Sequence, residues 1–284
     1  MKSALALKTL LGLESNVSVV DVGANPIDTN PPYKSLYDQG LAHVVGFEPN
    51  KEAYEKLMGV KKENDAFFPV ALGDGNEAKF NICHAQGMSS NFDPDFEVMK
   101  RFQLYPEAAH IKKMVMIQTK KLDDIQEAHN SDMIKIDVQG SELRIFQNAQ
   151  EVLKNVVLIH TEAMFVPIYK NQPLFADQDA FLRENGFVFH TITEIIKRTY
   201  RPFIINKDKR NGLNQLCTAD VVYFANWERM YELETQKLLK LTFMLDEIYK
   251  SYDLGMFTLF AYVCYMISVC SVLFVSCQFH MFGN

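Results

Sequence analysis

The chain has 284 residues, which is enough for one large α/β domain with an extension or for two small domains. Hydrophobic residues make up 48% of it, and the formal net charge is −6. This acidic balance argues against a nucleic-acid partner, because nucleic-acid-binding proteins usually present a basic face. The five cysteines show no C-x-x-C spacing and indicate free thiols in a reducing, cytoplasmic compartment.

Strands and helices are predicted to alternate along the chain after an amphipathic N-terminal helix over residues 3–11, which lacks the apolar core and cleavage site of a signal peptide. Strands are expected at 17–21, 42–47, 66–70, 79–84, 113–119, 133–137, 155–162, 187–193 and 219–224. Helices are expected at 33–39, 51–58, 95–104, 138–148 and 175–185. This alternation is typical of an α/β fold with a doubly wound, mostly parallel sheet. Residues 198–214 are expected to be polar and irregular.

The first strand and its turn occupy residues 17–25. Four of the first six residues are valine, which favours a strand buried on both faces. The strand ends at Asp21, and Gly23 then allows a tight turn with no Cβ in the way of a ligand. Since open α/β sheets bind ligands at the carboxyl ends of their strands, the sequence predicts a ligand site at this turn.

Acidic residues follow four of the predicted strands. They are Asp21, Glu48, Asp74 and Asp137. At the same edge of a parallel sheet these side chains can converge on one ligand. Glu48 lies about one βαβ unit after the glycine turn, where an acid is expected to accept hydrogen bonds from ribose hydroxyls. Any one of them could be a solvated loop residue or a helix cap, but four in succession are a stronger signal.

The glycine turn also narrows the choice of ligand. A nicotinamide dinucleotide needs Gly-x-Gly-x-x-Gly to bring a helix N-terminus against its pyrophosphate. Here the turn has only Gly23, and Pro26 interrupts the segment after it. A ligand with ribose and no phosphate fits better, and S-adenosylmethionine is the common one.

Five motifs together resemble the FkbM family of S-adenosylmethionine-dependent methyltransferases, in their order and spacing. They are Asp21-Val-Gly-Ala-Asn25, Gly46-Phe-Glu-Pro49, Ala71-Leu-Gly-Asp74, Gly87-Met-Ser-Ser90 and Ile134-Lys-Ile-Asp-Val-Gln-Gly-Ser-Glu142. The resemblance covers roughly residues 15–225 and implies a Rossmann-like class I methyltransferase domain, whose expected bounds are residues 1–225. It also implies S-adenosyl-L-methionine as cofactor.

The resemblance assigns roles to residues of this sequence. It implies that Asp21 and Gly23 line the pocket for the methionyl group, Glu48 holds the ribose and Asp74 contacts the adenine. The neighbouring residues Ala24, Asn25 and Pro49 complete the expected cofactor-binding set.

Two positions depart from the family pattern. Pro26-Ile-Asp-Thr29 stands where the family has a second glycine, and Gln139 stands where it often has glutamate. A glutamine cannot abstract a proton, so position 139 supplies no base.

Methyl transfer from a sulfonium is an in-line displacement, in which the enzyme positions the reactants and removes a proton from a hydroxyl acceptor. The catalytic candidates are Asp137, Glu162 and His160. His160 and Glu162 are two residues apart on one strand and share a face, although a hydrogen-bonded core histidine is the better explanation of His160. A functional role is favoured for Glu162, because a carboxylate at the end of a buried strand needs a partner, but two possible ligands are too few to predict a metal site.

The predicted function is O-methylation of a hydroxyl on a small molecule or glycan. Two alternatives remain open at this stage. One is an NAD(P)-dependent reductase of Rossmann type, which the single turn glycine disfavours. The other is a non-catalytic binding module that keeps the fold.

The C-terminal extension, residues 226–284, has a different composition. Residues 227–250 are predicted to form an amphipathic helix. Residues 254–277 contain no charged side chain, and this segment is long enough to span a bilayer. Two interpretations stand: a membrane tail that holds the domain at a cytoplasmic surface, or a helix packed on the domain or in a homodimer interface. The lysines that precede the segment favour a cytoplasmic domain in the first case.

Overall fold

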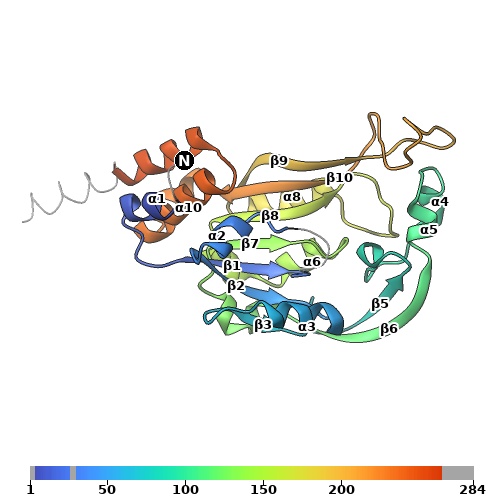
Figure 1. The fold of residues 1–284 in the computed structure, drawn as a ribbon, viewed down its shortest axis with the longest axis horizontal. Helices are drawn as coiled ribbons and strands as arrows, with labels where there is room; N and C mark the ends of the chain where they lie inside the picture. Colours follow the sequence, from blue (N-terminus) through green and yellow to red (C-terminus); the bar gives the residue numbers. More distant parts are fainter. Residues whose placement is uncertain (1–3, 26–29, 264–284) are drawn as a thin grey trace, which may run out of the picture. The chain divides into compact units, whose positions relative to one another are not determined.

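The computed structural model describes residues 4–25 and 30–263 (Figure 1). The chain forms two compact units. The larger, called here the sheet unit, comprises Ser18–Pro31 and His43–Phe224. The smaller, called the helical unit, comprises Met1–Val17, Pro32–Ala42 and Ala225–Asn284.

A seven-stranded sheet forms the centre of the sheet unit, with the strand order β3-β2-β1-β7-β8-β10-β9. Its strands are β1 (Val17–Val22), β2 (Ala42–Phe47), β3 (Ala66–Phe68), β7 (Met133–Ile136), β8 (Leu158–Met164), β9 (Phe187–Lys197) and β10 (Leu216–Ala225). The pairs β2–β3, β1–β7 and β7–β8 are parallel, whereas β10 runs antiparallel to β8. The prediction of a mostly parallel α/β sheet is therefore confirmed.

The helices are short, and most lie where the sequence predicts them. They are α1 (Ala4–Leu11), α2 (Lys34–Asp38), α3 (Lys51–Gly59), α4 (Phe96–Met99), α5 (Tyr105–Ala108), α6 (Glu142–Gln147), α7 (Gln150–Asn155), α8 (Phe175–Glu184), α9 (Trp227–Glu232) and α10 (Thr235–Glu247). Single 3-10 turns occur at Gln86–Met88, Leu122–Asp124 and Gln126–Ala128. The Asn50 side chain accepts a hydrogen bond of 3.1 Å from the Ala53 amide and so caps α3, as predicted.

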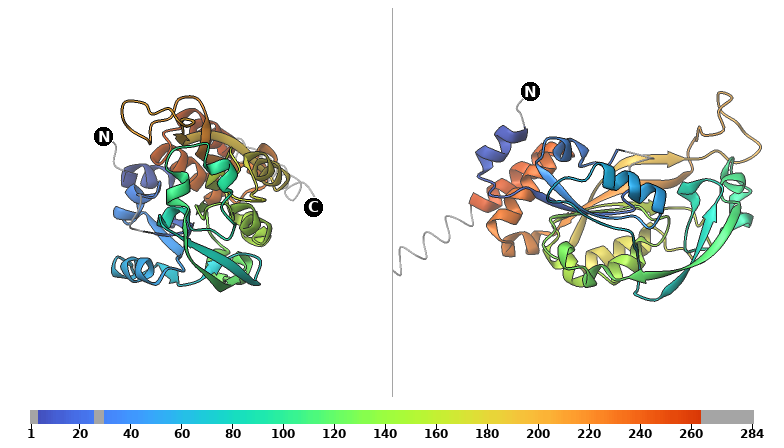
Figure 2. Two further views of the ribbon diagram at one scale, coloured as in Figure 1. Left: turned by 90° about the vertical axis from the view of Figure 1, so that its right-hand side faces the viewer. Right: turned by 60° about the horizontal axis from the view of Figure 1, so that its bottom comes forward.

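The two faces of the sheet differ in character. On one face, apolar side chains such as Val20, Ile134 and Ile159 pack in a core with Ile145 of α6 and Leu182 of α8. Figure 2 shows these green-yellow and yellow helices together on one side of the sheet. Because side chains alternate along a strand, the residues between them point to the opposite face. Those residues include the polar side chains of the candidate active site.

A second, three-stranded sheet corrects one prediction. Its strands are β4 (Ala71–Leu72), β5 (Glu77–Cys83) and β6 (Ile111–Lys120), in the order β4-β6-β5. β3 ends at Phe68 and Pro69 follows, which has no N–H for the strand ladder. The chain then pairs with β6. Asp74 therefore follows a strand of the small sheet, and the prediction that four acids end strands of one sheet was wrong for this residue.

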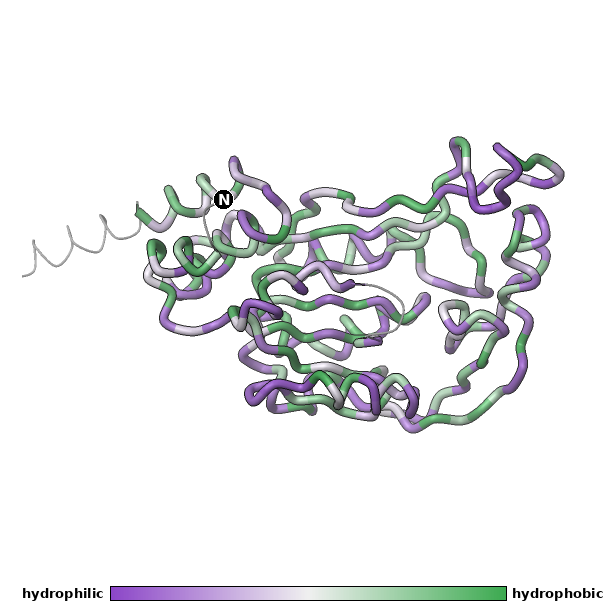
Figure 3. Tube along the Cα trace, in the orientation of Figure 1, coloured by the Kyte–Doolittle hydropathy of each residue, from purple (hydrophilic) through white to green (hydrophobic). Residues whose placement is uncertain are grey.

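Three element boundaries also differ from the prediction. The helix expected at 95–104 shortens to α4, and the chain then turns at Leu104, whose φ is 71°. The strand expected at 155–162 begins at Leu158, because α7 extends to Asn155. The helix expected at 138–148 begins only at Glu142. Before α6, Gly140 has a φ of +102°, which is incompatible with a right-handed helix, and the Glu142 carboxylate accepts hydrogen bonds from the Val138 and Gly140 amides. Residues 198–214 are irregular as predicted, and Figure 3 shows them as largely hydrophilic.

In the helical unit, the helix predicted at 227–250 is divided into α9 and α10. The Thr242 hydroxyl of α10 lies 2.7 Å from that of Thr258, and both side chains are buried. Of the predicted apolar segment 254–277, residues 264–277 lie outside the described residues. Within the described part of the chain, no helix has the length and apolar character needed to cross a bilayer.

Candidate active site

The turn after β1 is built around Gly23, whose φ is +78°. The amides of Gly23 and Ala24 both donate to the Phe47 carbonyl, over 3.0 and 3.1 Å, and the Asn25 amide donates to the Gly23 carbonyl over 2.8 Å. A Cβ at position 23 would lie 2.3 Å from the carbonyl oxygen of Asp137. Glycine is therefore required twice, for the left-handed backbone and for the close approach of a neighbouring chain.

Asp21 lies within β1, directly opposite Lys135 of β7 in the parallel register. Its Oδ1 atom is 3.2 Å from the Lys135 ammonium; the Asp21 side chain is buried, and that of Lys135 is nearly so. The same ammonium donates to the Gly23 carbonyl over 3.4 Å. Lys135 was not among the predicted site residues, although a lysine between the isoleucines of a buried strand was a visible signal.

Glu48 directly follows β2 and is buried. Its Oε1 atom accepts a hydrogen bond of 2.7 Å from the Asn50 amide, and its own amide donates to the Phe68 carbonyl. The preceding residue, Phe47, carries the carbonyl that binds the glycine turn. Glu48 and Pro49 are thus attached to the backbone that supports Gly23.

Asp74 is in a different setting, after β4 of the small sheet. Its Oδ1 atom accepts a hydrogen bond of 3.0 Å from the Asn76 amide. This contact stabilises a local turn, in the manner of an Asx turn. A contact with adenine stays a prediction for this residue.

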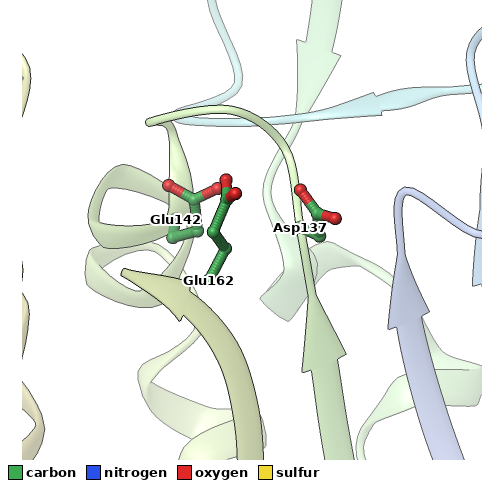
Figure 4. A group of neighbouring side chains, drawn as sticks. All are labelled: Asp137, Glu142 and Glu162. Atoms are coloured by element: carbon green, nitrogen blue, oxygen red, sulfur yellow. The ribbon is translucent and has the colours of Figure 1, made fainter. Parts of the chain in front are cut away.

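Three carboxylates gather at the carboxyl ends of β7 and β8, as Figure 4 shows. They belong to Asp137 after β7, Glu142 at the start of α6 and Glu162 on β8, and their oxygens lie within 4.8 Å of one another. The Gln139 amide nitrogen donates to Asp137 over 2.9 Å and to Glu162 over 3.2 Å. Sequence reasoning found Asp137 and Glu162 but missed Glu142, whose carboxylate folds back onto its own loop.

His160 lies on β8 and shares its face with Glu162, as the alternation predicts. It is buried, and its Nε2 atom is 3.2 Å from a carboxylate oxygen of Asp220 on β10. In the register Asp220 is opposite Glu162, so His160 reaches it diagonally across the strand pair. The histidine therefore has a fixed partner, which the sequence alone could not supply.

The model of the Methyltransferase FkbM domain matches residues 21–189, more than half of the chain. The chain belongs to the FkbM methyltransferase family. The predicted family is confirmed, and with it the Rossmann-like class I methyltransferase fold that the strand order displays. Comparison with curated proteins finds no match.

Solved structures that resemble this FkbM methyltransferase are distant in sequence. A protein from Thermoplasma acidophilum assigned as a methyltransferase is 10% identical, over 76% of this chain and 70% of that one, with a TM-score of 0.38. The precorrin-6y C5,15-methyltransferase of Geobacter metallireducens is 12% identical, over 78% and 86%, with a TM-score of 0.35. The plantazolicin methyltransferase BpumL is 10% identical, over 78% and 81%, with a TM-score of 0.36.

The carboxylate cluster of this FkbM methyltransferase has unusual proton affinity. Burial raises the pKa of Glu142 to about 7, and the neighbouring Asp137 adds to the shift, against the opposing effect of hydrogen bonds from the amides of Val138 and Gly140. Burial, together with Asp137 and Glu142, raises the pKa of Glu162 well above its ordinary value. Near neutral pH the cluster therefore retains a proton. Three carboxylates at this spacing could also face one divalent cation, which prefers oxygen ligands.

Lys135 supplies positive charge next to this acidic region. Burial lowers the pKa of Lys135, but the carboxylates of Asp21 and Asp137 outweigh burial, and the net shift is upward. The ammonium is thus held in its charged form and does not act as a base. In the structure it donates a hydrogen bond to the Gly23 carbonyl and balances the charge of Asp21.

Proposed function

We propose that this protein transfers a methyl group from S-adenosylmethionine to a hydroxyl of a small molecule or glycan. One observation supports the proposal above all others. The turn at Gly23 lies against the backbone of Asp137, since a Cβ on Gly23 would be 2.3 Å from the Asp137 carbonyl oxygen. A predicted cofactor turn and a cluster of proton-accepting groups are therefore neighbours, as a group transfer between two bound molecules requires.

The residues proposed to hold the cofactor fit a ribose-bearing ligand without phosphates. Gly23 provides a surface with no Cβ, and with Asp21, Ala24 and Asn25 it would receive the methionyl group. Glu48 is oriented by the Asn50 amide and would accept hydrogen bonds from the ribose hydroxyls. When bound, the cofactor supplies a methyl group activated by a sulfonium. Pro49 and Asp74 complete the proposed set, toward the ribose and the adenine.

Asp137 is the proposed acceptor of the proton from the substrate hydroxyl. The Gln139 amide donates to its carboxylate, and the ammonium of Lys135 lies close enough to interact with it electrostatically. The raised pKa of Glu162 means that this group holds its proton more tightly than an ordinary carboxylic acid, so it is better suited to orient the acceptor than to deprotonate it. His160, which is paired with Asp220, is a second proposed base. Because it is buried, a role in orienting other groups of the site is favoured over direct proton transfer.

Glu48→Ala is expected to weaken the binding of S-adenosylhomocysteine by roughly 30- to 150-fold, since a hydrogen bond to a charged group contributes about 2 to 3 kcal/mol. Isothermal titration calorimetry measures this. Glu48→Gln keeps an oxygen for the Asn50 amide and is expected to lose less. Glu52→Ala, on the exposed side of α3 next to Lys56, is the matched control and should bind as the wild type does. Equal affinity in Glu48→Ala and the wild type would remove the ribose assignment.

The same titrations separate the alternatives. An NAD(P)-dependent reductase would bind NADPH in preference to S-adenosylhomocysteine. The single glycine of the turn disfavours binding of such a dinucleotide. A non-catalytic module would bind the cofactor product but transfer no labelled methyl group to any hydroxyl-bearing acceptor. A methyltransferase with another acceptor would label amines or carbons in the same assay.

A further inference from the structure

Lys135 is a buried cation on the polar face of the sheet. Its side chain is 12% exposed, and that of its partner Asp21 is 4% exposed. The neighbours of Lys135 on β7, Ile134 and Ile136, point the other way, into the apolar core. An apolar side chain could be buried equally well at this position, and it would not have the desolvation cost of an ammonium.

The cost of this arrangement is large. Moving an ammonium and a carboxylate out of water is unfavourable for each ion, and an ion pair recovers that loss only with good geometry and additional hydrogen bonds. A buried pair is thus weak evidence for a contribution to stability. The presence of the Lys135–Asp21 pair is better explained by a role in holding nearby groups in place.

The contacts of the Lys135 ammonium identify what it fixes. It lies 3.2 Å from the Asp21 carboxylate, near the end of β1, and 3.4 Å from the Gly23 carbonyl oxygen, at the start of the turn that follows. Parallel pairing places Lys135 directly opposite Asp21, so the side chain spans from one strand to its neighbour. The negative charges of Asp137 and Asp220 also raise the pKa of Lys135 and so favour its charged form.

We propose that Lys135 is a positioning residue that sets the shape of the cofactor turn by holding Asp21 and the Gly23 carbonyl together. The inference rests on the proposed function, because it assigns the turn to the methionyl group of the cofactor. Lys135 acts through Asp21 and Gly23 and takes no part in proton transfer. A purely structural counterion would stabilise the sheet but leave the turn unchanged.

Lys135→Met in the full chain tests the proposal by two readouts. Calorimetry with S-adenosylhomocysteine is expected to show at least tenfold weaker binding. Amide hydrogen exchange in the ligand-free protein is expected to be at least tenfold faster at Gly23 and Ala24, whose amides bond to the Phe47 carbonyl, and unchanged at Val20. Lys113→Met, at an exposed lysine of β6, is the control and should change neither measurement.

The outcomes are distinguishable. Unchanged exchange at Gly23 and Ala24 overturns the positioning role, even where the thermal midpoint falls. If the wild type itself binds no S-adenosylhomocysteine, the proposed function fails, while the exchange readout still decides the role of Lys135. If Lys135→Met does not fold, Lys135→Arg keeps the charge but moves the donors. Faster exchange at the turn with a retained fold then supports the proposal, and wild-type exchange with wild-type affinity overturns it.

Discussion

Gly23→Ala is expected to abolish detectable binding of S-adenosylhomocysteine and to destabilise the protein by about 3 kcal/mol or more. The residue has a φ of +78°, which costs an alanine about 1 kcal/mol. The added Cβ would also lie 2.3 Å from the backbone carbonyl oxygen of Asp137, so β1 and the chain after β7 must separate. Calorimetry and urea unfolding measure the two effects.

Gly40→Ala is the matched control for this prediction. Gly40 has a φ of +72°, but a Cβ there would meet no atom within 4 Å. The alanine is therefore expected to cost only the backbone strain of about 1 kcal/mol and to leave ligand binding intact. If the two variants lose equal stability, the close approach between the turn and Asp137 is not what constrains Gly23.

Glu142→Gln is expected to change how the stability of the protein depends on pH. The pKa of Glu142 is raised from 4.5 to about 7 by burial, so between these values the folded state binds more protons than the unfolded state. Stability contributed by this group is therefore lost as the pH rises through that window. At about 1.4 kcal/mol for each pKa unit, the full effect approaches 3 kcal/mol.

The glutamine removes this dependence and keeps an oxygen for the amides of Val138 and Gly140. The free energy of unfolding of Glu142→Gln, relative to the wild type, is expected to rise steadily from pH 4.5 to pH 7. Urea unfolding in the presence of EDTA, which removes any bound divalent cation, measures it. Glu52→Gln, at an exposed glutamate, should show no such rise. A difference between Glu142→Gln and wild type that stays constant with pH would contradict the prediction.

Much of the site was predictable because its signals are local. The valines of 17–22 and the apolar run of 42–47 predicted β1 and β2 where the structure has them. Gly23 was predicted to form a tight turn, and its positive φ agrees, since only glycine adopts this backbone freely. Asp137 and Glu162 followed from their places at predicted strand ends, and the motif set led to the FkbM family.

Other features depended on segments far apart in the sequence. Asp74 does not lie at the predicted edge, because β4 pairs with the part of β6 that lies 48 residues later in the chain. Glu142 joined the carboxylates of Asp137 and Glu162 because the helix α6 begins four residues later than predicted, which leaves a loop that its side chain closes. The partner of His160, Asp220, comes from an antiparallel strand added after β8.

The sequence by itself therefore determined the fold class, the family, the glycine turn and two of the three clustered carboxylates. Strand and turn propensities depend on residues that are adjacent in the chain, so they can be predicted from the pattern of side chains in the sequence. Only the tertiary structure decided which strand lies beside which, and with that the pairing of Lys135 with Asp21 and the third carboxylate of the cluster. These contacts arise from register and burial between distant segments, where the free energy of packing outweighs local preference.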